Sequence, residues 1–73
     1  MIDNEEIAEE LSMVMIECSE KLEATLEKVK AHCSQREYEA YREGIGHILA
    51  YMLTDIMGPL YERHPQIKPG AIR

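Results

Sequence analysis

The chain has few of the features that stabilise or identify a very small protein. It has 73 residues, and its two cysteines, Cys18 and Cys33, are too few for a disulfide framework and do not form a CxxC zinc-binding pair. A core of this size is marginally stable by itself, and small proteins commonly add disulfides, a metal ion or a second subunit. We therefore expect oligomerisation.

Basic patches and long apolar runs are also absent. The net charge is -6, and residues 1–33 hold nine Asp or Glu against three Lys, so we expect no binding to DNA or RNA, which requires clustered Lys or Arg. The most apolar segment, residues 44–57, is shorter than the roughly 20 residues that span a bilayer. The start of the chain, MIDNEEIAEE, is acidic and does not resemble a secretory signal. We expect a cytoplasmic protein that binds no membrane.

A first helix is predicted over about residues 3–32. Asp3 has the position of an N-cap, and Glu6 would close a capping box three residues later. The apolar positions recur at steps of three and four and repeat every eleven residues, a pattern of long and nearly straight helix packing. These positions, which we expect to face the core, are Ile7, Leu11, Val14, Cys18, Leu22, Thr25, Val29 and Cys33.

A second helix is predicted over about residues 35–57. The segment SQRE places a second capping box at Ser34 and Glu37, and Gly58-Pro59 should end or kink the helix before one further turn at 59–63. Because the connection between the helices is short, they should be antiparallel neighbours. The predicted core face of the second helix consists of Tyr38, Tyr41, Ile45, Ile48, Leu49, Met52, Ile56 and Leu60.

These elements predict an all-α antiparallel helical hairpin over residues 1–64 and an extended, Pro-containing tail over 65–73. The segment GIGHILAYMLTDIM, residues 44–57, is apolar or small on nearly every side, and one hairpin cannot bury both sides of it. Glycine inside a helix is unfavourable unless another backbone approaches closely. We therefore expect two hairpins to dimerise into a four-helix bundle, with an interface formed by Gly44, Gly46, His47, Ala50, Tyr51 and Thr54.

No arrangement typical of nucleophilic or acid–base catalysis is visible, and we expect neither enzymatic activity nor a cofactor. The alternative is a helical bundle that binds a metal or small ligand through Glu43 and His47, which a dimer would present twice. The spacing of these two residues differs from the Glu-x-x-His spacing of di-iron carboxylate proteins. The two cysteines lie about 22 Å apart along one helix, so they cannot form a bridge within the chain.

The C-terminal segment LYERHPQIKPG contains two X-Pro bonds, which reduce the entropy lost when a segment docks. Its side chains Tyr61, His64 and Ile67 could bind a protein partner. The more ordinary interpretation is a structural strap over one end of the bundle. We thus expect a small dimeric interaction or regulatory module that binds itself and an unknown protein.

Overall fold

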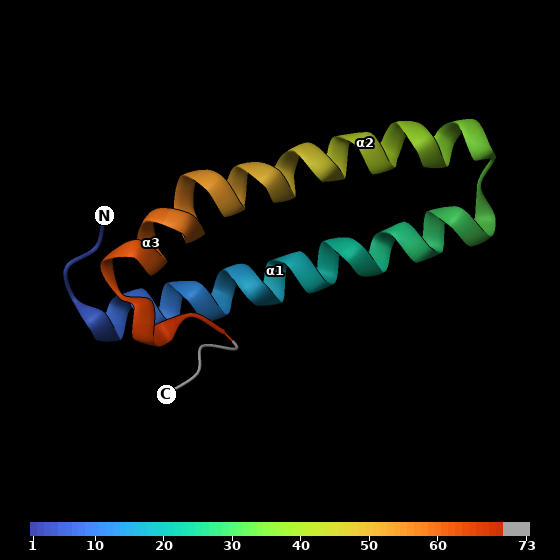
Figure 1. The fold of residues 1–73 in the computed structure, drawn as a ribbon. Coiled ribbons are helices and arrows are strands. Elements are labelled where there is room, and N and C mark those ends of the chain that lie inside the picture. The colour runs from blue at the N-terminus through green and yellow to red at the C-terminus, as the bar shows by residue number, and fades with distance from the viewer. Residues whose placement is uncertain (70–73) are drawn as a thin grey trace.

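The computed structural model describes residues 1–69, which form a hairpin of two long helices that run in opposite directions (Figure 1). Helix α1 spans Glu5–His32 and α2 spans Gln35–Tyr51. The helical path then continues through a π-helical segment, Met52–Met57, into the short helix α3, Gly58–Arg63. No β-strand occurs among the described residues, so the predicted all-α hairpin is confirmed.

The turn between α1 and α2 is organised by the predicted capping box. The Ser34 hydroxyl accepts a hydrogen bond from the Glu37 N–H at 3.2 Å, and the Glu37 carboxylate accepts one from the Ser34 N–H at 2.9 Å. These bonds satisfy two amides that the first turn of a helix leaves unpaired. The backbone N–H of Ser34 and its hydroxyl hold the pKa of Glu37 below its ordinary value.

Helix α1 begins two residues later than predicted, because Asn4 rather than Asp3 is its N-cap. The Asn4 side chain accepts a hydrogen bond from the Ile7 N–H at 3.1 Å. Asp3 lies outside the helix and pairs with Arg63 at the other end of the chain. The expected capping box between Asp3 and Glu6 is therefore wrong, since Asn4 satisfies the same kind of amide and leaves Asp3 free for a distant partner.

The face of α1 that packs against α2 differs from the predicted apolar stripe. The buried residues of α1 are Ala8 and Ser12, whereas Ile7 and Val14 remain 43% and 46% exposed. Cys18 and Cys33, which we also assigned to the core, are exposed. Leu11, Leu22, Thr25 and Val29 of the predicted stripe are half-buried, so the prediction holds in part; it missed the inward-facing Ala8 and Ser12.

Hydroxyl pairs explain why polar residues occupy that inward face. The hydroxyl of Thr25 lies 2.6 Å from that of Tyr41, and Ser12 is hydrogen-bonded to Tyr61 in the same way. A small Ser or Thr gives a bulky tyrosine room and a hydrogen-bond partner, so neither hydroxyl is buried without one.

Helical structure continues through Gly58-Pro59 into α3, so the predicted end is wrong, whereas the predicted further turn at 59–63 is present. Proline has no N–H and clashes with the preceding turn of an α-helix, and the wider π-helical turn before it accommodates this residue. The Gly58 N–H donates to the carbonyl of Leu53, five residues earlier. An altered turn also rotates the side chains that follow it, and Leu60 is fully buried immediately afterwards.

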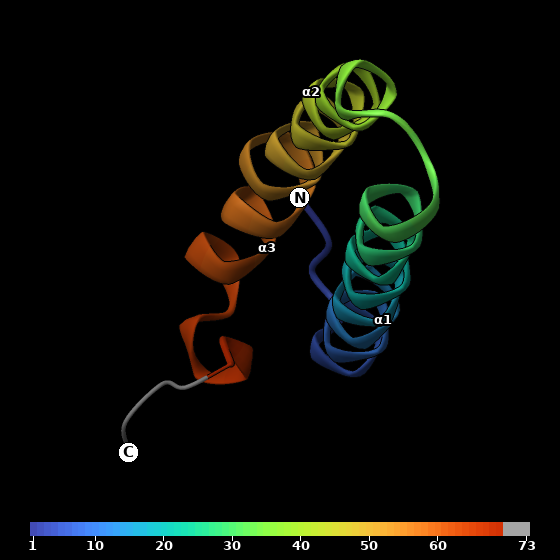
Figure 2. The same ribbon diagram turned by 90° about the vertical axis from the view of Figure 1, so that its right-hand side faces the viewer.

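The chain closes with a 3-10 turn, Pro65–Ile67, at the end of the hairpin where α1 begins. We call residues 61–69 the strap. Viewed from the turn end, α1 and α2 lie side by side in one layer, and the 3-10 turn lies beside α1 (Figure 2). The predicted extended tail is thus a 3-10 turn over 65–67, and its residues 70–73 lie outside the described residues.

Candidate functional site

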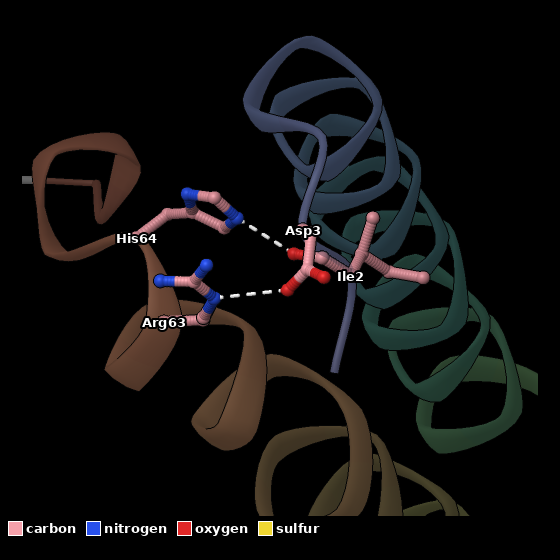
Figure 3. A network of polar contacts seen from close by, with 4 residues as sticks. All are labelled: Ile2, Asp3, Arg63 and His64. Atoms are coloured by element: carbon pink, nitrogen blue, oxygen red, sulfur yellow. Dashed lines mark hydrogen bonds and ion pairs between the residues drawn. The ribbon is translucent and has the colours of Figure 1, made fainter.

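The strap holds the first residues of the chain through two side chains (Figure 3). The Nε2 atom of His64 lies 2.6 Å from the carbonyl oxygen of Ile2, so the ring donates from this nitrogen. The Arg63 Nε atom donates to the Asp3 carboxylate at 3.1 Å, and this guanidinium holds the pKa of Asp3 below its ordinary value. His64 is 6% exposed, whereas the ion pair is open to solvent and stabilises the contact only weakly.

The three residues predicted as partner anchors all belong to this contact or lie next to it. Tyr61 is half-buried and bonded to Ser12, His64 is buried, and Ile67 is half-buried in the 3-10 turn. The neighbouring Gln66 donates to the Glu5 carboxylate at 2.7 Å. The strap is therefore engaged within the chain, and any partner that used these side chains would have to displace it.

A second surface lies along one side of the hairpin, marked by the Thr25–Tyr41 hydrogen bond. On α1, Ile7 precedes Thr25 by eighteen residues, which is five whole helical turns, so both residues face the same way. On α2, Ile48 follows Tyr41 by seven residues and shares its side. We call this side the open face; its exposed residues are Ile7, Val14 and Cys18 of α1 and Gly44, Ile48 and Tyr51 of α2.

The six residues predicted to form a dimer interface are all exposed in the single chain. A Cβ atom added at Gly44 or Gly46 would meet nothing within 4 Å, so the chain itself does not provide the close approach that we expected at these glycines. The two glycines also point to different sides of the hairpin. Gly44 lies on the open face, one turn before Ile48, whereas Gly46 lines a groove on the opposite side.

That groove is a shallow hollow of about 590 Å³ between α1 and α2, near the turn. Its apolar floor comes from Leu26, Ile45 and Leu49, and its rim carries charges of both signs. The rim residues are Glu39, Arg42 and Glu43. The groove is open to solvent, and none of the buried side-chain polar atoms of the described residues lacks a partner, so no unpaired buried polar atom lines it.

Glu43 and His47, the two candidate metal ligands, are exposed and lie one turn apart on α2. Glu43 also lines the rim of the groove, whereas His47 does not. Within residues 1–69, no group of three or more His, Cys, Asp and Glu side chains is placed to hold a metal ion. Among the described residues, Glu43 and His47 therefore belong to no such group of three.

None of the helices in the described part of the chain is both long enough and apolar enough to span a membrane. No protein family model, no curated protein and no solved structure matches this chain. Function must therefore be argued from the surfaces described above.

Proposed function

We propose that this protein is a homodimeric protein–protein interaction module, a four-helix bundle of two hairpins, without a catalytic role. The observation that carries the proposal is the small core of the single hairpin. Of residues 1–69, the buried apolar side chains are those of Ala8, Ile45 and Leu60. A larger number of apolar side chains remain more than two-fifths exposed, and a second copy would cover some of them. These side chains are those of Met1, Ile7, Met13, Val14, Ile48, Tyr51 and Leu53.

The shape of the chain supports the same proposal. The radius of gyration is 14.9 Å, against about 11 Å for a compact domain of this length. The accessible surface is 5586 Å², whereas a folded monomer of 8.4 kDa exposes roughly 4,600 Å². The excess of about 1,000 Å² is comparable to the roughly 800 Å² that each partner loses in a standard interface. An elongated hairpin thus has the surface that a stable dimer needs.

The proposed partner beyond the dimer is a protein with a basic surface. Residues 5–18 contain five Glu and no Lys or Arg, and the charge of α1 is therefore concentrated near its start. Glu9, Glu20 and Glu27 form one exposed row, because they lie eleven and eighteen residues apart on the helix. Such a row attracts Lys or Arg on a partner and is screened by salt.

The oligomeric state tests the proposal directly. Light scattering coupled to size exclusion should give twice the chain mass of 8.4 kDa at micromolar concentration. A well-folded monomer under these conditions would contradict the homodimer.

A partner recovered by cross-linking would test the acidic row. The affinity of this partner for the wild-type protein should fall as ionic strength rises from about 0.1 to about 1 M. Its affinity for the Glu9→Gln/Glu20→Gln variant should be lower than for the wild type. Glu62→Gln, an exposed substitution on α3, serves as the matched control. Equal affinity of all three proteins at every salt concentration would remove the acidic row from the proposal.

A further inference from the structure

We propose that the second copy packs on the open face in antiparallel orientation, with the two-fold axis passing between the copies at the level of Cys18 and Ile48. This inference rests on the proposed homodimer and adds its interface and its register. It separates α1 into two functional faces: one packs on α2 of the same chain, and the other packs on α1 of the second copy.

The stripe of α1 that borders the open face is symmetric about Cys18; Val14 and Cys18 in it are exposed, and Leu11, Leu22 and Thr25 are half-buried in the single chain. Leu11 and Thr25 each lie seven residues from Cys18, and Val14 and Leu22 each lie four residues from it. An antiparallel copy centred on Cys18 therefore aligns each member of such a pair with the other member in the second chain. Parallel packing would instead align each of these residues with itself, and the charges beside the stripe distinguish the two orientations. Cys18 is also at the midpoint of α1, which spans Glu5–His32, so this register overlaps the full length of both helices.

The charges beside the stripe are arranged for the same register. Glu10, Glu17, Lys21 and Lys28 are exposed and lie along one flank of the stripe at helical spacing. Glu17 and Lys21 each lie two residues from Ser19, and Glu10 and Lys28 each lie nine residues from it. Antiparallel pairing centred at Cys18–Ser19 thus places each glutamate near a lysine of the second copy. Parallel pairing would instead place the five glutamates of residues 5–18 beside the same five.

On α2, Ile48 lies at the same distance from the turn as Cys18 does on α1, and so at the same level along the hairpin. Cys18 lies fifteen residues before Cys33, and Ile48 lies fifteen residues after it, so both are equally far from the turn. The hydrogen bond between Thr25 and Tyr41, each eight residues from Cys33, shows that residues paired in this way lie opposite one another. The axis that passes Cys18 therefore also passes Ile48.

This register assigns a role to Gly44. Gly44 lies four residues before Ile48, and Tyr51 lies three residues after it, both on the open face. Around an axis at Ile48, Tyr51 of the second copy comes to lie over Gly44. The space above Gly44, where an added Cβ would meet nothing within 4 Å, then receives the ring of Tyr51, which is 64% exposed in the single chain. Gly46 faces the groove on the other side of the hairpin and is outside this interface.

Cysteine cross-linking tests the register. In the Cys33→Ser variant, mild oxidation with diamide should convert most of the dimer into a Cys18–Cys18 disulfide, because helices in contact bring facing residues within disulfide range. In the matched Cys18→Ser variant, the two Cys33 thiols would be about 45 Å apart, so cross-linking should be low and should depend on concentration. If light scattering shows a dimer but Cys18 does not cross-link, the register is wrong and the homodimer stands. A monomer would overturn both.

Two glycine substitutions provide an independent test of the face. Gly44→Leu and Gly46→Leu add the same side chain to the same helix, two residues apart. Gly44→Leu should raise the dimer dissociation constant by about tenfold or more, because it fills the space assigned to Tyr51 of the second copy. Gly46→Leu should leave the constant within about twofold. An unchanged constant in Gly44→Leu, or a rise in Gly46→Leu alone, would place the interface on another face.

The flanking charges give a third readout that does not alter the core. Glu17→Lys places like charges beside Lys21 of the second copy and should weaken the dimer. The double variant Glu17→Lys/Lys21→Glu should restore the original dissociation constant, because it exchanges the two charges. If the double variant is as weak as Glu17→Lys alone, these residues do not face each other across the axis.

Discussion

The two ends of the hairpin are stabilised in different ways. Residues 1–69 include five buried residues: four of them, Ala8, Ser12, Leu60 and His64, lie at the strap end, whereas the remaining one, Ile45, lies in α2. The strap end is connected by hydrogen bonds between residues 49 to 62 positions apart in the sequence. The turn end is organised by a capping box between residues three positions apart.

This difference shows that the strap end has both a buried apolar core and long-range hydrogen bonds within one chain, whereas the hydrogen bonds that organise the turn end are local. Local bonds at the turn direct the chain back on itself, but they bury little apolar surface there. The strap end combines apolar burial with long-range hydrogen bonds, and these bonds join the strap to the start of the chain and of α1. Between the ends, the open face leaves apolar side chains such as Ile7, Val14 and Ile48 exposed in the single chain, and in the proposed dimer the second copy would cover them. Substitutions at the strap end, at the start of α3 and at the turn should therefore differ in their effect on stability.

The largest effect is expected from Leu60→Ala at the strap end. Leu60 is the largest side chain that is fully buried among the described residues, so its truncation should lower the free energy of unfolding by about 2–5 kcal/mol. Leu53→Ala, which alters a side chain that is 57% exposed, should cost much less. Urea unfolding of both variants measures the difference. Equal losses would show that the burial at the strap end contributes no more than the exposed surface.

A smaller effect is expected at Gly58, where the π-helical segment leads into α3. A Cβ at this position would lie 3.0 Å from the carbonyl oxygen of Leu53, so Gly58→Ala should lower the free energy of unfolding by about 1–3 kcal/mol. Gly46→Ala meets no such atom and should raise it by about 0.5–1 kcal/mol through helix propensity. Thermal unfolding should therefore shift in opposite directions. Stabilisation by both substitutions would show that the π-helical turn relaxes without cost.

The smallest effect is expected from the capping box at the turn. The pKa of Glu37 is lowered in the folded chain, so its contribution is present above the ordinary value of 4.5 and is lost as pH falls through the lower folded pKa. Glu37→Gln keeps a side-chain acceptor but does not titrate. The wild type should therefore melt at a higher temperature than Glu37→Gln at neutral pH, and the gap should close below about pH 4. A gap independent of pH would contradict this role.

The fold could be predicted largely from local signals, and its details could not. The capping box at Ser34 and the helical periodicity predicted both long helices and their antiparallel arrangement. Asp3 and Asn4 are equally suitable caps by sequence, and only the distant Arg63 distinguishes them. The π-helical segment Met52–Met57 before Pro59 likewise has no local signal in the sequence that we used.

The candidate surface was harder to predict, because α1 carries two overlapping stripes. The eleven-residue repeat that includes Ile7, Val14 and Cys18 is the more apolar stripe, and we assigned it to the core. The face that packs on α2 includes Thr25, which belongs to that stripe, and Ser12, which lies outside it; their partners are tyrosines far away in the sequence. The one available signal was the presence of more apolar positions on α1 than a single partner helix can cover.

The central claim, that the hairpin is completed by a second copy, is tested most directly by the dependence of unfolding on protein concentration. Association stabilises a folded dimer by mass action, so the midpoint of thermal unfolding should rise steadily as the protein concentration is raised by about a hundredfold. Circular dichroism of the helical signal across this range measures the midpoint. A cooperative midpoint that is independent of concentration would show that the single hairpin is stable alone and would contradict the account.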